Sequence, residues 1–197
     1  MFWKGSGGAE AATVVVPFDV DRTMVEAARH DPQAFEPLYR RYVAHIYSLA
    51  FYETRDPHVA EDITELVFLR ALDALPRFRE QGEGAGSTFK VWLYSIARHV
   101  IANERRTRRR RPVEVIDAAL DLPAADDPAA TVVARLEAER AMRAVMALPD
   151  ERRQALLLRL VHELSAREIG QIMGKSEGAV RVLIHRALDS VRRQLAS

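Results

Sequence analysis

Charged and polar side chains recur at helical spacing near the C-terminal end of the chain. They are of the types that hydrogen-bond to phosphate oxygens and to the edges of bases. On one exposed helix face they would form a surface that binds duplex nucleic acid. The residues of this set are Lys175, Glu177, Arg181, His185 and Arg186, with Ser176 before the helix as its cap.

Two short helices separated by a tight turn would position this surface. Ser165 and Glu168 have the spacing of a capping box at the start of the first helix. Gly174 suits the left-handed backbone at its end, and Gly170 lies where two steeply crossing helices need a small residue. The pattern is that of a helix-turn-helix, although an ordinary pair of core helices is an alternative. The residues predicted to face inward are Ile169, Ile172, Met173, Val180, Leu183, Ile184 and Ala187.

A second group of aromatic and cationic side chains lies on and just before a helix predicted from Phe89 to about Thr107. Aromatic rings stack on unpaired bases and cations follow the backbone of single-stranded DNA. The loop that precedes this helix could enclose an extruded base. Trp92 is either a DNA contact or a core residue, whereas Phe89 is expected in the core. The candidates for contacting melted DNA are Arg79, Ser87, Thr88, Trp92, Tyr94, Arg98, His99, Asn103, Arg105 and Arg106.

Charge is strongly segregated along the chain, although the formal net charge is only +1. Residues 104–111 contain six arginines and one glutamate. This excess is larger than a helix dipole requires and favours a phosphate-binding arm. Residues 114–139 contain seven acidic residues and one arginine. Because residues 112–131 are also rich in alanine and proline, they are predicted to form a flexible acidic linker.

The helical pattern divides the 197-residue chain into two units. We predict a mobile tail over 1–22, a first helical unit over 23–111, the linker, and a second unit over 132–197. The second unit is predicted to contain four helices, the last two being the helix-turn-helix. No strand pattern is found, so the predicted fold class is all-α, with two small helical domains. In the helix predicted over 132–147, the residues expected to face inward are Leu136, Ala141, Val145 and Leu148.

Composition excludes several classes of protein. The chain has no cysteine, which excludes disulfides and thiolate metal sites. No apolar run approaches the roughly 18 residues of a membrane span, so we expect a cytoplasmic protein without membrane insertion.

Blocks of sequence in both units resemble the extracytoplasmic-function (ECF) sigma factors, a group of bacterial RNA polymerase specificity subunits in the sigma-70 family. The resemblance covers about residues 34–194. The blocks include Ala-Phe-Glu-Pro-Leu-Tyr-Arg-Arg-Tyr (34–42), Val-Phe-Leu-Arg-Ala-Leu (67–72), Phe-Lys-Val-Trp-Leu-Tyr-Ser-Ile-Ala-Arg (89–98) and the helix-turn-helix. Their order and spacing in one chain make the resemblance specific.

The resemblance implies a division of labour between the units. The first unit would bind the clamp of core RNA polymerase and open the −10 element of the promoter. The second unit would contact the polymerase flap and read the −35 element as a duplex. An anti-sigma factor is the further partner that the resemblance implies, and neither a cofactor nor a catalytic residue is expected.

The resemblance also assigns residues. Arg181 and Arg186 would contact the −35 duplex, with Lys175, Ser176 and His185 near phosphates. Two positions depart from the family pattern: Glu65-Leu66 replaces a glutamine-glutamate pair in the clamp-binding helix, and Leu183 stands where arginine is common. The residues expected to bind the polymerase are Asp62, Glu65, Leu66, Phe68 and Arg70.

Two other functions remain as alternatives. A stand-alone helix-turn-helix regulator would explain the C-terminal pattern, but it would not explain the Trp92 helix with its arginine-rich end. An enzyme would need a reactive cluster, and Glu61, Asp62 and Glu65 could be imagined as metal ligands. The histidines do not form a ligand spacing with them, and the sequence contains no phosphate-binding loop or nucleophile motif.

Overall fold

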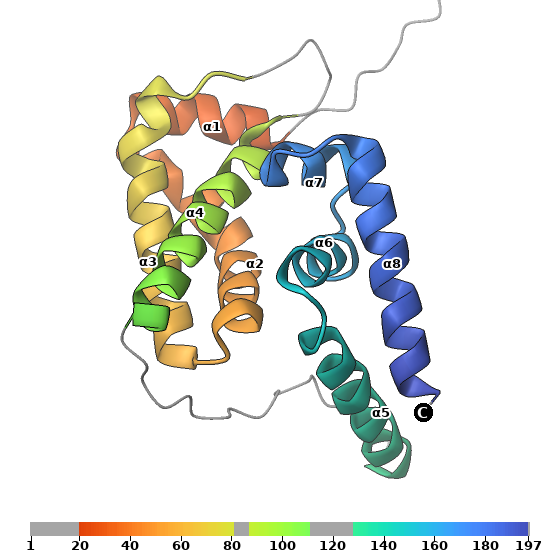
Figure 1. Cartoon of the computed structure of the whole chain (residues 1–197). Coiled ribbons are helices and arrows are strands. Elements are labelled where there is room, and N and C mark those ends of the chain that lie inside the picture. Colours follow the sequence, from red (N-terminus) through yellow and green to blue (C-terminus); the bar gives the residue numbers. More distant parts are fainter. Residues whose placement is uncertain (1–19, 81–86, 111–127, 197) are drawn as a thin grey trace, which may run out of the picture.

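Helices make up both halves of the protein in the computed structural model, which describes residues 20–80, 87–110 and 128–196. No strand occurs in these ranges, so the all-α prediction is confirmed. The elements are α1 (Val20–His30), a 3-10 turn (Pro32–Phe35), α2 (Glu36–Thr54), α3 (Pro57–Ala74), a 3-10 turn (Leu75–Arg77), α4 (Phe89–Arg110), α5 (Pro128–Met146), α6 (Asp150–Leu160), α7 (Ala166–Met173) and α8 (Glu177–Leu195) (Figure 1).

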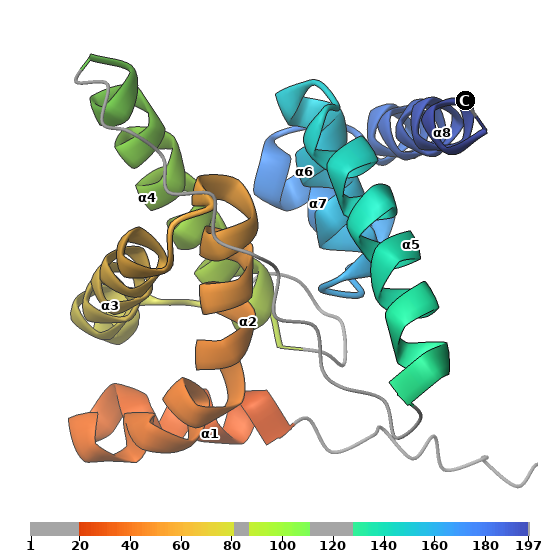
Figure 2. The same cartoon turned by 90° about the horizontal axis from the view of Figure 1, so that it is seen from below.

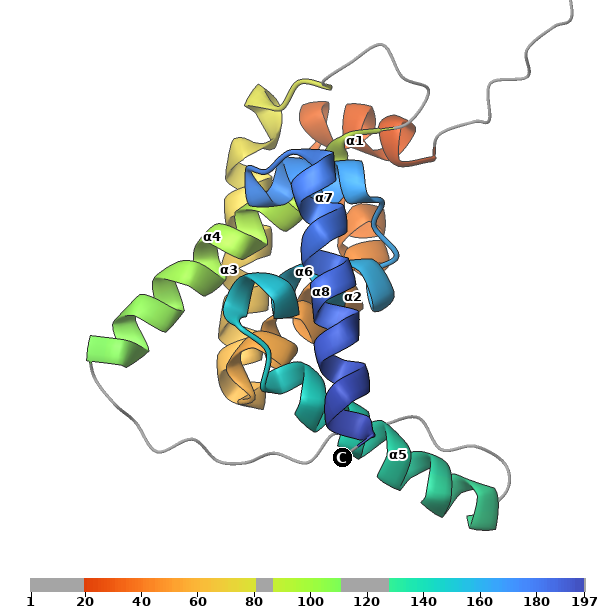
Figure 3. The same ribbon diagram turned by 45° about the vertical axis from the view of Figure 1, so that its right-hand side comes forward.

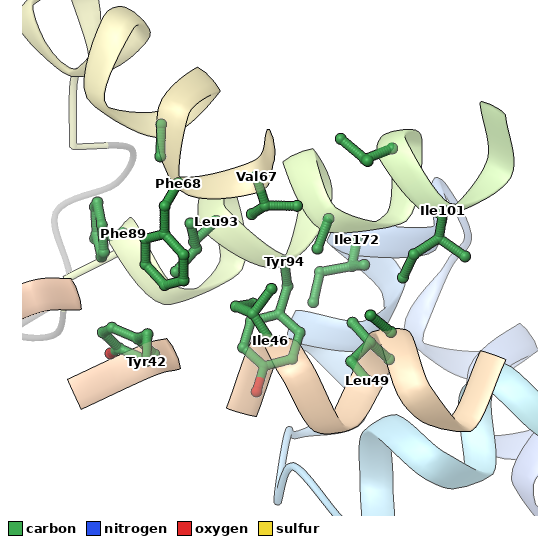
Figure 4. Packing of buried hydrophobic residues seen from close by; sticks show 14 of the residues in the cluster. Tyr42, Ile46, Leu49, Val67, Phe68, Phe89, Leu93, Tyr94, Ile101 and Ile172 are labelled. Carbon is green, nitrogen blue, oxygen red and sulfur yellow. The ribbon is translucent and has the colours of Figure 1, made fainter. Parts of the chain in front are cut away.

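The first unit, α1 to α4, is built around an apolar core between α2, α3 and α4 (Figure 4). Local sequence fixes where its helices begin, because the side chain of Asp31 accepts a hydrogen bond from the Gln33 amide and that of Asp56 accepts one from the Val59 amide. Arg55, in left-handed backbone, ends α2. Fully buried side chains from all three helices fill the core, including Leu38, Ile46, Val67, Phe89 and Leu93.

The second unit, α5 to α8, places the predicted helix-turn-helix against α6. The capping box at the start of α7 is present: the Ser165 side chain accepts from the Glu168 amide, and the Glu168 carboxylate accepts from the Ser165 amide. Gly174 ends α7 with φ 66°. A Cβ added to Gly170 would lie 2.6 Å from the Lys175 carbonyl oxygen, so only glycine fits at this crossing.

The two units lie side by side, and α7 packs against α4 (Figures 2 and 3). One continuous apolar cluster includes Leu93 and Ala97 from α4 together with Leu158, Ile169 and Ile172 from the second unit. The sequence predicts two units, but it does not predict that their cores join.

Several boundary or burial predictions need correction or lie outside the described ranges. Helix α1 begins at Val20, so residues 20–22 are helical rather than part of the tail, while residues 1–19 are outside the described part. Helix α5 begins at Pro128, so residues 128–131 are helical rather than linker, while residues 111–127 are outside the described part. Leu136 was expected to face inward but is 55% exposed. The residues that pack against α8 lie further along the chain, with Val145 near the end of α5 and Leu148 just after it. No helix in the described ranges is both long and apolar enough to cross a membrane.

Candidate nucleic-acid interface

Helix α8 presents two arginines and a histidine to solvent. Arg181, His185 and Arg186 are all exposed, and Val180 and Ala187 on the opposite face are buried. Ser176 caps the helix by accepting a hydrogen bond from the Ala179 amide at 3.2 Å. The helix therefore presents the polar face that the sequence predicts for it.

Two side chains of this surface each lie beside a carboxylate of the same helix. Arg181 Nη2 lies 2.5 Å from Glu177 Oε1, and His185 Nδ1 lies 3.1 Å from Asp189 Oδ2. Such exposed pairs contribute little to stability. These pairs orient the side chains of Arg181 and His185, but a phosphate or a base edge can still take the place of the carboxylate.

Two arginines near this surface were missed by the sequence analysis. Arg159 and Arg167 line a groove of about 460 Å³ together with Arg181 and His185. Arg159 Nη1 donates a hydrogen bond to the Leu164 carbonyl oxygen, 3.0 Å away, which fixes it beside the start of α7. The sequence pattern did not indicate that these two arginines lie near the others, because they come from the end of α6 and the first turn of α7 rather than from α8.

The Trp92 side chain is both packed on the core and partly accessible, so its position is compatible with either alternative that the sequence left open. Its ring lies 4.8 Å from that of Phe78 and 5.5 Å from that of Phe89, measured between centroids. It is nevertheless only partly buried, whereas Phe89 is fully buried as expected. Trp92 therefore rests on the aromatic core with part of its surface available for stacking.

A pocket of about 340 Å³ adjoins Trp92 and is lined also by Arg79, Thr88 and Ser95. Glu80 shapes its edge by accepting hydrogen bonds from the Thr88 amide at 2.6 Å and from the Ser87 hydroxyl at 2.6 Å. Arg79 is exposed and donates to the carbonyl oxygen of Phe78 at 2.9 Å.

The remaining candidates on α4 divide into two faces. His99, Asn103 and Arg106 are exposed. Arg98 and Arg105 are partly buried, and Tyr94 is completely buried. In this arrangement Tyr94 is therefore not a surface residue, contrary to the sequence-based assignment: its hydroxyl shares a 3.0 Å hydrogen bond with His162 Nδ1, and burial raises its pKa.

The expected polymerase-binding residues lie on α3. Asp62, Glu65, Leu66 and Arg70 are exposed, and Leu66 retains 39% of its surface. Phe68 is different: it is buried between α2 and α3, so it supports the surface from inside rather than contacting a partner.

An apolar groove of about 720 Å³ runs between α2 and α3 beside the exposed residues of α3. Two carboxylates, Glu61 and Glu65, lie on its α3 side. The groove is lined by Tyr39, Val43, Tyr47, Leu69 and Leu72, among others. The carboxylates on α3 are not arranged as a metal site, because the described ranges contain no group of three or more potential ligands.

Comparison with known proteins identifies the class to which this arrangement belongs. The family model "Sigma-70 region 2" matches residues 38–111, and the model "Sigma-70, region 4" matches residues 138–191. The first match contains α3 and α4 and the second contains the helix-turn-helix. The chain belongs to the ECF group of the sigma-70 family, and it is an RNA polymerase sigma factor that acts with core polymerase and promoter DNA.

Individual relatives agree with this assignment. The chain is 31% identical over 192 residues to the ECF RNA polymerase sigma factor ShbA of Streptomyces griseus, covering 88% of this chain and 96% of the relative. It is 32% identical over 174 residues to the ECF RNA polymerase sigma factor BldN of Streptomyces coelicolor, covering 87% of this chain but only 64% of the relative. As a sigma factor the protein is not an enzyme, and the alternative of a polymerase-independent regulator is set aside.

Among solved structures, CnrH in complex with the cytosolic domain of CnrY has a similar fold. The TM-score is 0.68 at 22% identity, with 90% of this chain and 98% of that chain covered. At this level of identity the likeness concerns the fold alone.

Proposed function

We propose that the two units of this sigma factor read different forms of promoter DNA. The exposed face of α8 binds the −35 element as a duplex, with Arg181 at a base edge and Lys175, Ser176 and His185 near phosphates. Arg186 makes a further duplex contact, and Glu177 orients Arg181. The groove beside α8 supports this assignment and adds Arg159 and Arg167 as phosphate contacts.

The first unit binds the melted −10 element. The observation that carries this proposal is the pocket beside Trp92, where a partly exposed indole and an arginine line one cavity. An unpaired base can stack on the indole, while His99, Asn103 and Arg106 on the exposed face of α4 follow the backbone.

Core polymerase docks on α3 through Asp62, Glu65, Leu66 and Arg70. The carboxylates together with the exposed Leu66 favour a partner surface that is basic and partly apolar. An anti-sigma factor is a second proposed partner, since a solved structure of similar fold, that of the sigma factor RpoE from Bartonella quintana, is a complex with the anti-sigma factor NepR. Because these partners are cytoplasmic, we place the protein in the cytoplasm.

Transcription in vitro with core polymerase tests the proposal. A genomic DNA library with mapped start sites identifies the promoters that the wild-type protein uses. On such a promoter, Trp92→Ala is expected to reduce transcript yield and binding to the single-stranded −10 oligonucleotide roughly 5- to 150-fold, since stacking contributes about 1–3 kcal/mol per base.

Trp92→Phe keeps an aromatic face and serves as the control, with most of the yield retained. Binding of Trp92→Ala to the −35 duplex should equal that of the wild type. If the wild-type protein started RNA synthesis on no template, the assignment of promoter binding to these surfaces would be refuted. If Trp92→Ala were fully active, the −10 role of α4 would be refuted.

A further inference from the structure

An exposed valine lies on the face of α8 that we assign to duplex DNA. Val182 retains 48% of its surface. It lies nearly opposite the buried Val180 and Ala187, because an α-helix has about 3.6 residues per turn. The side chain therefore points away from the protein, and Figure 1 shows α8 along one edge of the molecule. The side chains that we place at DNA on this recognition face are also exposed: Arg181, His185 and Arg186.

Packing within the protein does not account for this valine. The partly buried apolar residues of α8 that pack against the two apolar clusters are Leu183, Ile184, Leu188 and Val191. In the ranges that the structure describes, Val182 belongs to neither cluster. Single exposed apolar side chains are common on protein surfaces. This one differs in its position, because it lies among side chains that complement the charge of DNA.

The residues around Val182 leave it uncovered. Arg181 Nη2 lies 2.5 Å from Glu177 Oε1, so this long side chain extends toward the start of α8. Gly178 lies four residues before Val182 and hence on the same face. It has no side chain, and a Cβ added there would meet nothing within 4 Å. A base pair can therefore approach Val182 closely.

The major groove offers one apolar group to such a side chain. Each base edge there presents hydrogen-bond donors or acceptors, and only thymine adds a methyl group, at C5. Because valine is β-branched, it has one strongly preferred rotamer in a helix, so it loses little rotamer freedom on contact. Against cytosine it would cover the N4 amino group without accepting its hydrogen bond, which is unfavourable. Val182 therefore fits thymine and disfavours cytosine.

We propose that Val182 is a specificity-determining residue that contacts the C5 methyl group of a thymine in the −35 duplex, next to the base pair that Arg181 contacts. The proposal rests on the assignment of the exposed face of α8 to the −35 element. Consecutive Cα atoms are about 3.8 Å apart and consecutive base pairs about 3.4 Å apart. Neighbouring residues of a helix in the groove can therefore reach neighbouring base pairs.

Deoxyuridine tests this contact, because it differs from thymidine only in lacking the C5 methyl group. The duplex is the −35 region of a promoter identified by start-site mapping, with each thymine replaced singly by uracil. Fluorescence anisotropy measures binding of the full chain, as wild type and as Val182→Ala. Val20→Ala is the matched control, since it removes the same atoms from a valine of α1 that is 40% exposed.

At one position, we expect deoxyuridine to weaken binding of the wild type about fourfold, which corresponds to the burial of one methyl group. Val182→Ala should bind the unmodified duplex more weakly by a similar factor and show no further loss at that position. The two changes are then non-additive, as expected for groups in contact. Val20→Ala should match the wild type on both duplexes. With cytosine at that position the wild type should bind more weakly still, and 5-methylcytosine should restore about fourfold.

The proposal is overturned if no deoxyuridine weakens binding of the wild type, or if Val182→Ala responds to deoxyuridine as the wild type does. A −35 element without thymine on either strand would overturn it as well. Arg181→Ala distinguishes these failures from failure of the −35 assignment. If Arg181→Ala weakens binding to the unmodified duplex while no deoxyuridine does, only the methyl contact fails. If Arg181→Ala binds that duplex as tightly as the wild type, the assignment of α8 fails, and the methyl contact fails with it.

Discussion

Single side chains on α8 are expected to determine which duplex the protein prefers. Arg181→Ala should lower affinity for the −35 duplex roughly 5- to 150-fold, since a two-point contact to guanine is worth about 1–3 kcal/mol. Glu177 holds the guanidinium in place before binding, and giving up that exposed pair costs little. Fluorescence anisotropy with a labelled promoter duplex measures the effect.

Arg192→Ala provides the control for this prediction. Arg192 is an exposed arginine in the last turn of the same helix, and it pairs with Asp189 rather than with a residue of the recognition face. If both variants lost the same affinity for the −35 duplex, binding would depend only on the net charge of α8.

Residue types and helical period were enough to predict which side chains of α8 face solvent, because one face of that helix is plainly apolar. Residue type alone misplaced Tyr94 on the DNA surface, and the family resemblance misplaced Phe68 on the polymerase surface, since both side chains are buried. Helical period gives the direction of a side chain from its own helix, but not whether another element covers that direction. For Tyr94 the covering element is the turn after α6, 68 positions further along the chain.

The helix-turn-helix as an element depends on the absence of a side chain at Gly170. Gly170→Ala should destabilise the protein by roughly 1–3 kcal/mol, because the added methyl would meet the Lys175 backbone at 2.6 Å. Binding of the −35 duplex should fall as well, since a shift of α7 against α8 alters the angle between the helices. Urea unfolding measures the stability.

Gly178→Ala is the matched control in the same element. A methyl group there has nothing within 4 Å, and alanine is favoured over glycine in a helix by roughly 0.5–1 kcal/mol. This variant should be as stable as the wild type or slightly more stable. Destabilisation by both substitutions would contradict the close approach inferred for Gly170.

Elements with local signals were predicted well from sequence. The caps at Ser165 and Ser176 and the stop at Gly174 depend on groups within a few residues of each other. The start of α4 was predicted less completely. The Ser87 hydroxyl does accept a hydrogen bond from the Phe89 amide. The shorter hydrogen bond, however, runs from the Thr88 amide to the carboxylate of Glu80, eight residues earlier. No local spacing rule predicts a contact between two groups on either side of a loop.

At the scale of the whole molecule, closure of the two units should weaken in mild acid. Burial is the main cause that lowers the pKa of His162 from 6.5 to about 4, and the nearby charges of His45 and Lys90 act in the same direction. The closed form requires neutral His162 and thus binds fewer protons than an open form. Its advantage is complete above pH 6.5 and declines as the pH falls toward 4, by at most about 1.4 kcal/mol per pH unit.

Energy transfer between fluorophores attached to Asp73→Cys on α3 and Gln194→Cys on α8, in a chain with no other cysteine, follows this opening as a function of pH. Asp150, whose pKa lies below its ordinary value of 3.8, contributes only in stronger acid. His162→Gln cannot take up a proton, so its response between pH 6.5 and 4 should be flat. A response as steep as that of the wild type would show that another group is responsible.

The joining of the two units could not have been predicted from sequence patterns. Its contacts connect residues that are far apart in the chain: Arg105 and Glu53 differ by 52 positions and Arg153 and Glu53 by 100. Each of these residues also has an ordinary local explanation, such as a charged residue near the end of a helix. Helix periodicity and capping rules describe residues that are close together in the chain. They therefore do not predict contacts between residues that only the tertiary fold brings together.

The unequal accessibility of α8 and α4 has a consequence for the order of events at a promoter. A protein whose duplex-reading face is exposed, while the pocket for an unpaired base is lined in part by Gln171 of its own second half, can sample intact double helix more readily than stray single strands. Binding of an unpaired base would then be the later step, at sites where the duplex-reading face is already bound. Selectivity would thus come from timing as well as from base contacts.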